Sequence, residues 1–278
     1  MIYDFTFINN VLFNWRHRTV DGGDHRSFFT IVNNYFKPGP ATPLDDPIAY
    51  RLLKPEARRA RPPVDDYGQA YVAGNVVENN ETVTADNWNG GVQVASIAEE
   101  SSVLPKIRAE RPYPHAFVTI QPAAEAYELV LANAGATRPR RDAVDDRIIN
   151  MVRTGEVNAK LVNDIREELE RVRYSPQVIE AISGLVEKGI ITDIEQVGGY
   201  PEYKGEPYID SDDDGMPDDW ELEHGLNPHD PSDASADANG DGYTNIEAFL
   251  YGLDPRAEAA KWPTPRTYVD LWEDVPLE

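Results

Sequence analysis

The first 80 residues contain short segments of apolar and β-branched residues, each preceded by an asparagine. These asparagines are Asn10, Asn34 and Asn75, so the intervals between them are 24 and 41 residues. The first interval suits one coil of a parallel β-helix, and the second suits one coil plus a proline-rich excursion over 38–66. Asparagines at equivalent turns can stack in a hydrogen-bonded ladder, although paired asparagines are also ordinary turn residues.

From residue 121 onward, the apolar positions recur at the spacing of α-helices, and we expect their apolar faces to form a core. The first helix is expected over 123–134 with its end at Gly135, and the second over 144–151 with its end near Gly155. The third carries Leu161, Ile165, Leu169 and Val172, and the fourth begins at Ser175 and Pro176 and ends at Gly189.

The composition is strongly acidic, with 49 acidic and 26 basic residues and a formal net charge of -23. Such a chain repels phosphate backbones and anionic lipid surfaces, so we expect no nucleic-acid partner and no membrane-surface role. No apolar stretch is long enough for a transmembrane segment, and the opening residues lack the pattern of a signal peptide. The absence of cysteine excludes disulfides and thiolate chemistry.

Most of the charge imbalance is local, because 15 of the 49 acidic residues lie between positions 205 and 255, where lysine and arginine are absent. The first part of this segment has the spacing of an EF-hand-like calcium loop, with oxygen ligands at positions 1, 3, 5, 7, 9 and 12 and a glycine at position 6. The predicted ligands are Asp210, Asp212, Asp214, the carbonyl of Met216, Asp218 and Glu221, and the turn glycine is Gly215.

A second loop fits the same pattern less completely. Its predicted ligands are Asp237, Asn239, Asp241, the carbonyl of Tyr243, Asn245 and Glu247. Position 12 is Ala248, so the bidentate ligand would come from Glu247 one place early or from Asp230 or Asp233. We expect a structural Ca²⁺ whose binding is coupled to folding, because closely spaced carboxylates repel one another without metal.

Several segments together resemble the C-terminal portion of bacterial pectate lyases of the first polysaccharide lyase family. They include NNVLFNW at 9–15 and IVNNYFKPGPAT at 31–42. Further similar segments, in the same order, lie at 71–78, 85–92, 126–135, 141–145 and 198–203 and are followed by the two calcium loops. The loops themselves are similar to thrombospondin type 3 or dockerin-like modules.

The resemblance implies a fold class that is mainly β with α. It consists of terminal coils of a right-handed parallel β-helix over 1–120 and a helical segment over 121–197. A linker over 198–209, the paired calcium loops over 210–255 and a tail over 256–278 follow.

It also implies part of a secreted, calcium-dependent lyase that cleaves polygalacturonate by β-elimination. The localisation expected from the family is secreted, periplasmic or at the cell surface, and we expect a monomer. In this family the catalytic arginine and calcium ligands precede the segment that matches the start of this chain, so we assign no catalytic residue and expect those groups upstream of Met1.

A basic loop between the first two repeats contains residues that could contact an anionic sugar chain, or that simply face solvent. They are Arg16, His17, Arg18, His25 and Arg26. Two other functions stay open at this stage. One is a non-catalytic, calcium-stabilised interaction or anchoring module of a cell-wall-degrading system, and the other is action on a different acidic polysaccharide, such as alginate or a glycosaminoglycan.

Overall fold

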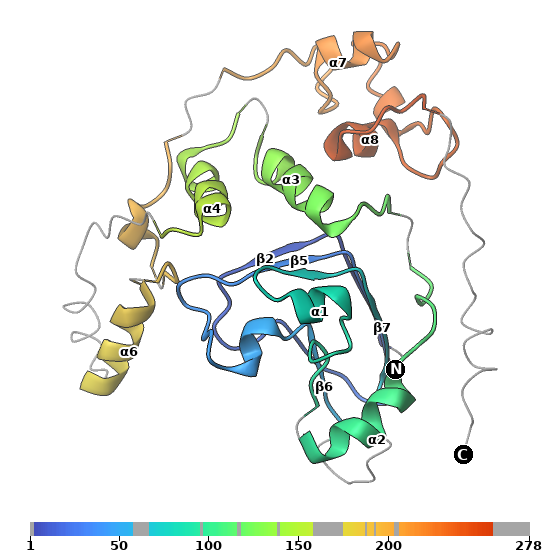
Figure 1. The fold of residues 1–278 in the computed structure, drawn as a ribbon. Helices are drawn as coiled ribbons and strands as arrows, with labels where there is room; N and C mark the ends of the chain where they lie inside the picture. Colours follow the sequence, from blue (N-terminus) through green and yellow to red (C-terminus); the bar gives the residue numbers. More distant parts are fainter. Residues whose placement is uncertain are drawn as a thin grey trace. The chain divides into compact units, whose positions relative to one another are not determined.

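The computed structural model describes residues 3–57, 67–94, 97–115, 118–137, 140–157, 175–186, 188–191, 193–202 and 206–257. These residues form two compact units, the larger from 3–137 and 141–202 and the smaller from 206–257 together with Arg140. Every strand in the described part of the chain lies in the larger unit (Figure 1). The smaller unit consists of short helices and acidic loops.

The strands of the larger unit form three sheets in which all neighbours run parallel. Each sheet takes its strands from successive passes of the chain. The first sheet contains β1 (Tyr3–Ile8), β4 (Ser27–Val32) and β7 (Gln69–Ala73); the second contains β2 (Val11–Phe13), β5 (Tyr35–Lys37) and β8 (Val76–Val77); the third contains β3 (Val20–Gly22) and β6 (Leu53–Pro55).

The pairing register follows the asparagine intervals. Val11 lies beside Tyr35, and Tyr35 lies beside Val76. These offsets equal the 24- and 41-residue intervals in the sequence, and the first sheet uses the same offsets. The predicted parallel pairing of the three repeated segments is therefore confirmed. The 17 additional residues of the second interval fall in the excursion after β5 and leave the register unchanged.

Asparagine side chains form the predicted ladder through the larger unit. The amide of Asn10 donates to the side-chain oxygen of Asn34 at 3.0 Å, and the amide of Asn34 donates to that of Asn75 at 2.8 Å. Each of these oxygens also accepts the backbone N–H of the preceding asparagine at 2.9 Å. Asn87, which the repeat pattern did not include, accepts the same two hydrogen bonds from Asn75 and ends the ladder.

The interior between the three sheets is apolar. Its fully buried side chains come from all three sheets and their connections; they include Ile31, Phe36, Leu52, Leu53 and Val77. Each such side chain stabilises the fold by about 1.5–3 kcal/mol relative to an exposed one. The outward side of β4 is also covered, because Phe28 packs on Tyr113 with ring centroids 4.9 Å apart.

Helices follow the sheets in the larger unit. Two predicted helices are observed, α3 (Ala123–Asn133) and α4 (Ala143–Thr154), and Gly155 ends α4 in the left-handed conformation at φ 73°. The fourth predicted helix is α6 (Pro176–Val186), whereas the predicted helix over 161–172 lies outside the described residues. Two others, α1 (Glu81–Ala85) and α2 (Ile97–Ile107), were not predicted. None of the helices described is both long and apolar enough to cross a bilayer.

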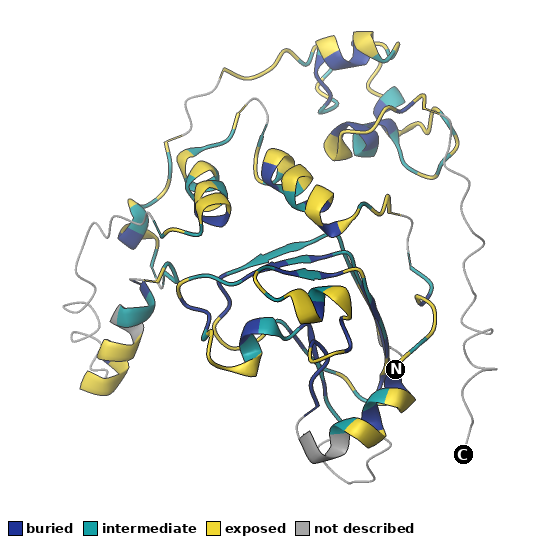
Figure 2. Cartoon of the chain, in the orientation of Figure 1, coloured by how far each residue is buried: buried dark blue, intermediate teal, exposed yellow. Residues whose placement is uncertain are grey.

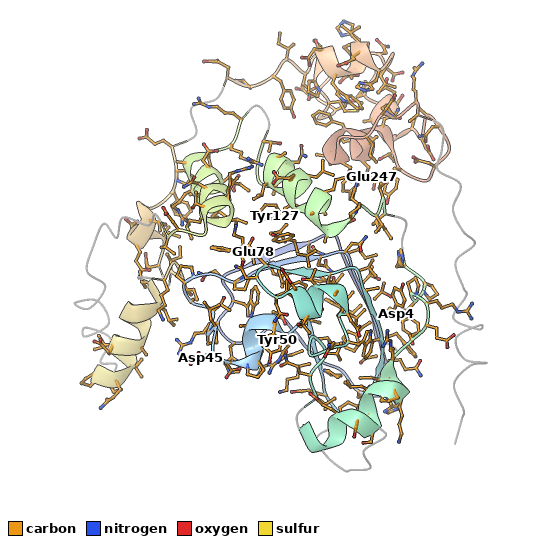
Figure 3. The ribbon with its side chains drawn as sticks, in the orientation of Figure 1. Asp4, Asp45, Tyr50, Glu78, Tyr127 and Glu247 are labelled. Carbon is orange, nitrogen blue, oxygen red and sulfur yellow. The ribbon has the colours of Figure 1, made fainter. Side chains whose placement is uncertain are left out.

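A polar cluster joins α3 to the second sheet. Lys37 lies 3.5 Å from the carboxylate of Glu78 and donates to the hydroxyl of Tyr127 at 3.3 Å, so a residue of α3 and one that follows β8 share one cation (Figure 3). Tyr35 donates to the same carboxylate at 2.9 Å, and its ring lies 4.4 Å from that of Tyr127. Burial and this hydrogen bond raise the pKa of Tyr35. The cluster holds the helical segment against the strands.

The smaller unit has its own apolar core. It contains α7 (Asp218–Glu223), the short 3₁₀ helix η3 (Asp233–Ser235) and α8 (Asn245–Tyr251). Trp220 of α7 packs on Phe249 of α8 with ring centroids 5.1 Å apart, and Met216 and Ala234 are buried beside them. Both helices bury one side and expose the other (Figure 2).

We predict that Asn34→Ala destabilises the larger unit by about 3 kcal/mol. The substitution removes the acceptor of two hydrogen bonds from Asn10 and the donor to the carbonyl of Phe7. It also removes the donor to the buried side-chain oxygen of Asn75, and each lost bond of this kind costs about 1 kcal/mol or more. Urea denaturation followed by circular dichroism measures the loss. The exposed Asn89 is a matched control, because Asn89→Ala is expected to change stability by less than about 0.5 kcal/mol. Equal effects of the two substitutions would contradict a stabilising ladder.

Candidate functional site

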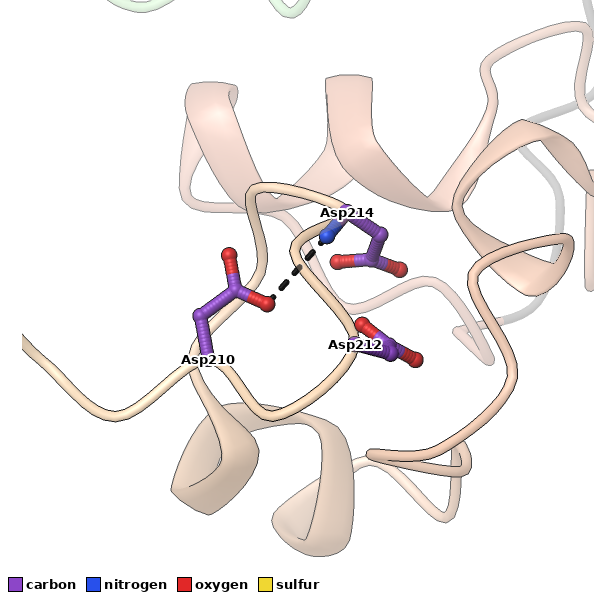
Figure 4. Close-up of side chains that lie close together, drawn as sticks. All are labelled: Asp210, Asp212 and Asp214. Atoms are coloured by element: carbon purple, nitrogen blue, oxygen red, sulfur yellow. Dashed lines mark hydrogen bonds between the residues drawn. The ribbon is translucent and has the colours of Figure 1, made fainter.

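The first acidic loop brings three of its predicted ligands together. Carboxylate oxygens of Asp210, Asp212 and Asp214 lie within 4.8 Å of one another (Figure 4). Asp210 accepts the backbone N–H groups of Asp214 at 3.2 Å and Gly215 at 2.9 Å, and Asp214 accepts the backbone N–H of Met216 at 2.8 Å. These bonds close the loop around its carboxylates.

Glu221 places a fourth carboxylate beside this group. Its side chain is fully buried, because Trp220 anchors α7 on the apolar core and this turns the inner side of the helix toward the loop. Neither carboxylate oxygen of Glu221 has a hydrogen-bond partner among the described residues, and the same holds for both oxygens of Asp212 and for Oδ2 of Asp214. Buried acceptors without donors indicate that a cation would be bound here.

A residue outside the predicted ligand set also reaches this group. One carboxylate oxygen each from Asp214, Glu221 and Asp233 lie within 4.8 Å of one another. The sequence pattern offered Asp233 only as a substitute ligand for the second loop, because its spacing from the first loop matches no standard position. The sequence spacing therefore gave no signal for this contact.

The electrostatics of the cluster oppose ionisation without a cation. Burial raises the pKa of Glu221 to about 7, and the charges of Asp214, Asp212 and Asp233 add to the rise. Burial also raises the pKa of Asp214. A bound divalent cation would compensate both desolvation and repulsion. Carboxylate oxygens are the ligands that Ca²⁺ prefers, so these residues fit a calcium ion.

Asp218, the predicted position-9 ligand, has a different partner. Its carboxylate accepts the backbone N–H and the hydroxyl of Ser211, both at 2.7 Å. The hydrogen bonds from Ser211 lower the pKa of Asp218. The structure therefore brings Asp210, Asp212, Asp214 and Glu221 together but does not include Asp218 in either acidic group.

The second loop is closed by hydrogen bonds. Asp237 accepts the backbone N–H groups of Gly240 at 2.7 Å and Gly242 at 2.9 Å, and the amide of Asn239 donates to Asp241 at 3.1 Å. Tyr243 donates its backbone N–H to Asp241 at 2.9 Å. These contacts shape a loop similar to the first one.

Two predicted ligands of the second loop instead form hydrogen bonds at the start of α8. Glu247 accepts the backbone N–H and the hydroxyl of Thr244, both at 2.8 Å, in a capping box. Asn245 is buried; its amide donates to the carbonyl of Asp233 at 2.8 Å, and its side-chain oxygen accepts the N–H of Ala238 at 3.3 Å. Within 206–257, the acidic groups close enough to share a cation are thus the two around Asp214.

The predicted substrate contacts lie in the larger unit and are not gathered into one cluster. Arg16 and Arg18 are exposed, and Arg18 lies 3.6 Å from Asp21. His25 is exposed, and Arg26 forms two hydrogen bonds with Asp24, at 3.2 and 2.6 Å, which lower the pKa of Asp24 to about 2.

Arg16 and Arg26 line different cavities. Arg26 lines a cavity of about 540 Å³ whose apolar side includes Phe5, Phe7 and Phe29. The stacked rings of Phe5 and Phe7 lie 5.7 Å apart. Arg16 lines a second cavity with Glu180 and Lys188.

Comparison with known proteins relates the chain to pectate lyases. It is 25% identical over 252 residues to the probable pectate lyase C of Neosartorya fischeri, covering 90% of this chain and 48% of the relative. It is 26% identical over 261 residues to that of Aspergillus terreus, covering 91% and 49%. The probable pectate lyase C of Aspergillus fumigatus is also 26% identical, over 257 residues, with 90% and 48% covered.

The chain spans about half the length of the curated relatives it matches. No family model matches it. The predicted resemblance to pectate lyases is confirmed as a similarity of 25–26% identity. The relatives are fungal, so the more specific resemblance to bacterial enzymes and the thrombospondin-like character of the loops stay predictions.

We predict that Glu221→Gln stabilises the smaller unit against unfolding when calcium is absent and destabilises it when calcium is bound. In a chelator at pH 8, the variant should be more stable by about 1–2 kcal/mol, because a neutral amide removes a buried charge and can donate to Asp214 or Asp233. In saturating calcium it should be less stable, because a charged ligand is lost. Calorimetric unfolding of the full chain in both buffers measures the two shifts.

The matched control is Glu223→Gln, which changes an exposed carboxylate on the same helix. It should leave stability nearly unchanged in both buffers. A shift of the same sign for Glu221→Gln with and without calcium would show that this side chain does not bind the ion.

Proposed function

We propose that this chain is the C-terminal part of a calcium-dependent polysaccharide lyase that acts on pectate. The observation that carries the proposal is the similarity to probable pectate lyases, which extends over 90% of this chain but only about half of each relative. In this proposal, the three parallel sheets are terminal coils of a right-handed parallel β-helix, and the acidic module is a structural calcium site.

The edges of the sheets support this assignment. Strands β1, β2 and β3 each pair on one side only among the described residues. At the other end of the stack, Arg108 bridges to Ala70 of β7 and Val92 bridges to Leu53 of β6. One end of the stack is therefore covered by later parts of the chain, whereas the other presents open strand edges that further coils can extend.

The ladder supports the same direction of extension. Asn10 donates to Asn34, but no described residue donates to the side-chain oxygen of Asn10. At the other end, the amide of Asn87 donates to carbonyls of Asn75 and Val83, so its donors are already used. A preceding coil with an asparagine at the equivalent turn would supply the donor that Asn10 lacks.

The proposed reaction is β-elimination on a uronate chain. A base removes the proton on the carbon next to the carboxyl group, the glycosidic oxygen leaves from the adjacent carbon, and a carbon–carbon double bond forms between them. Calcium would acidify that proton by binding the uronate carboxylate. We propose that the base and its calcium ligands lie in coils that precede this segment. In the same proposal, Arg16, Arg18, His25 and Arg26 contact the anionic chain.

We predict that the purified chain releases few or no unsaturated uronides from polygalacturonate, with or without calcium. A longer polypeptide that includes the preceding coils should release them, and a chelator should abolish that release. The absorbance of the unsaturated product measures both reactions. Robust calcium-dependent release by this chain alone would contradict the placement of the catalytic groups, while inactivity of the longer polypeptide on every uronate polymer tested would contradict the lyase assignment.

A second candidate is a non-catalytic anchoring module outside the cell or at its surface. The separate core and acidic cluster of the unit within 206–257 favour it, because such a module can serve as an independent binding element.

Under this alternative, the full chain should co-sediment with plant cell-wall material in calcium and be released by a chelator. Bovine serum albumin under the same conditions is the control for non-specific retention. Equal recovery of the chain in the supernatant with and without chelator would contradict the anchoring function.

A further inference from the structure

We infer that Asp233, which the sequence offered only as a substitute ligand for the second loop, is a ligand of the cation bound by the first loop. A single ion would then connect this loop to η3, in the segment between the two loops. The inference rests on the proposed calcium function and identifies the ligand that completes the site.

The position of Asp233 supports a direct contact with the ion. Its Oδ2 accepts the backbone N–H of Asn227 at 2.9 Å, which fixes the orientation of the carboxylate. Its Oδ1 is buried and has no hydrogen-bond partner among the described residues. One carboxylate oxygen of Asp233 also lies within 4.8 Å of one each from Asp214 and Glu221, and both oxygens of Glu221 are buried and unpartnered among the described residues. A cation that all three share would satisfy these oxygens together.

The number of available oxygens agrees with calcium, which takes about six to eight. Asp210, Asp212, Asp214 and Asp233 can each provide one oxygen, Glu221 can provide two, and the carbonyl of Met216 can provide one. In EF-hand loops the position-9 side chain often contacts the ion through water. Here the corresponding side chain is held by Ser211, so Asp233 supplies the contact from another part of the chain.

The same residue connects the cation to the second half of the module. The backbone carbonyl of Asp233 accepts the amide of Asn245 at 2.8 Å, and Asn245 is the buried first residue of α8. Ala234 lies in the apolar core with Trp220 and Phe249. A cation on Asp233 therefore orders η3 and, through Asn245, the start of α8, while the second loop keeps its shape through hydrogen bonds.

The test compares Asp233→Asn with Asp230→Asn by calorimetric titration of the full chain with calcium. Asparagine can still accept from Asn227 but lacks the charge, so Asp233→Asn should lower the affinity of the first site by about tenfold or more. Asp230 is an exposed neighbour whose carboxylate accepts from Ser232, and Asp230→Asn should bind calcium like the wild type. Equal affinities of the two variants would overturn the inference.

Hydrogen exchange separates loss of a ligand from misfolding. Calcium should slow exchange of backbone amides in both 210–216 and 233–236 of the wild type. In Asp233→Asn at saturating calcium, protection should persist in 210–216 and be lost in 233–236, whereas a misfolded variant would lose both. Absence of calcium binding by the wild type would count against the proposed calcium function itself, and wild-type binding with unchanged protection in the variant would count against Asp233 alone.

Discussion

Stacked asparagine amides set the geometry of the larger unit. Parallel strands meet at buried turns, where backbone N–H groups need acceptors, and an asparagine provides an acceptor to one layer while donating to the next. The repeated bonds from Asn10 through Asn34 to Asn75 hold adjacent layers in one register. The apolar interior, the three sheets and the attachment of α3 through Lys37 all depend on that register.

In the smaller unit, several buried carboxylate oxygens have no hydrogen-bond donors among the described residues. Its core is small, and the acidic side chains beside Met216 and Trp220 lack the donors that the asparagines of the larger unit give one another. Like charges at close range destabilise a fold unless a cation or proton compensates them. The ladder thus stabilises itself with its own side chains, whereas the buried carboxylates of the acidic module would need a cation or a proton from solution.

The sequence predicts those features of the fold and of the candidate site that depend on spacing along the chain. The intervals between asparagines give the strand pairing, and the apolar periodicity and glycines locate α3, α4 and α6. The alternating spacing of the first loop predicts that Asp210, Asp212 and Asp214 lie close together. Features that depend on contacts distant in the sequence could not be predicted. The ladder ends at Asn87 only 12 residues after Asn75, and a carboxylate oxygen of Asp233 lies within 4.8 Å of one of Asp214, although the two residues belong to different parts of the module. Spacing rules contain no information about such contacts.

The ladder also has a chemical direction. Both internal asparagines, Asn34 and Asn75, accept from the previous layer and donate to the next one. Each internal layer therefore presents an acceptor to one neighbour and a donor to the other. Layers of this kind are interchangeable modules. A coil could be duplicated or exchanged within the stack without redesigning its neighbours, provided that it contributes one asparagine at the turn. The length of the outer loop is free to vary, as the unequal 24- and 41-residue intervals of this chain illustrate.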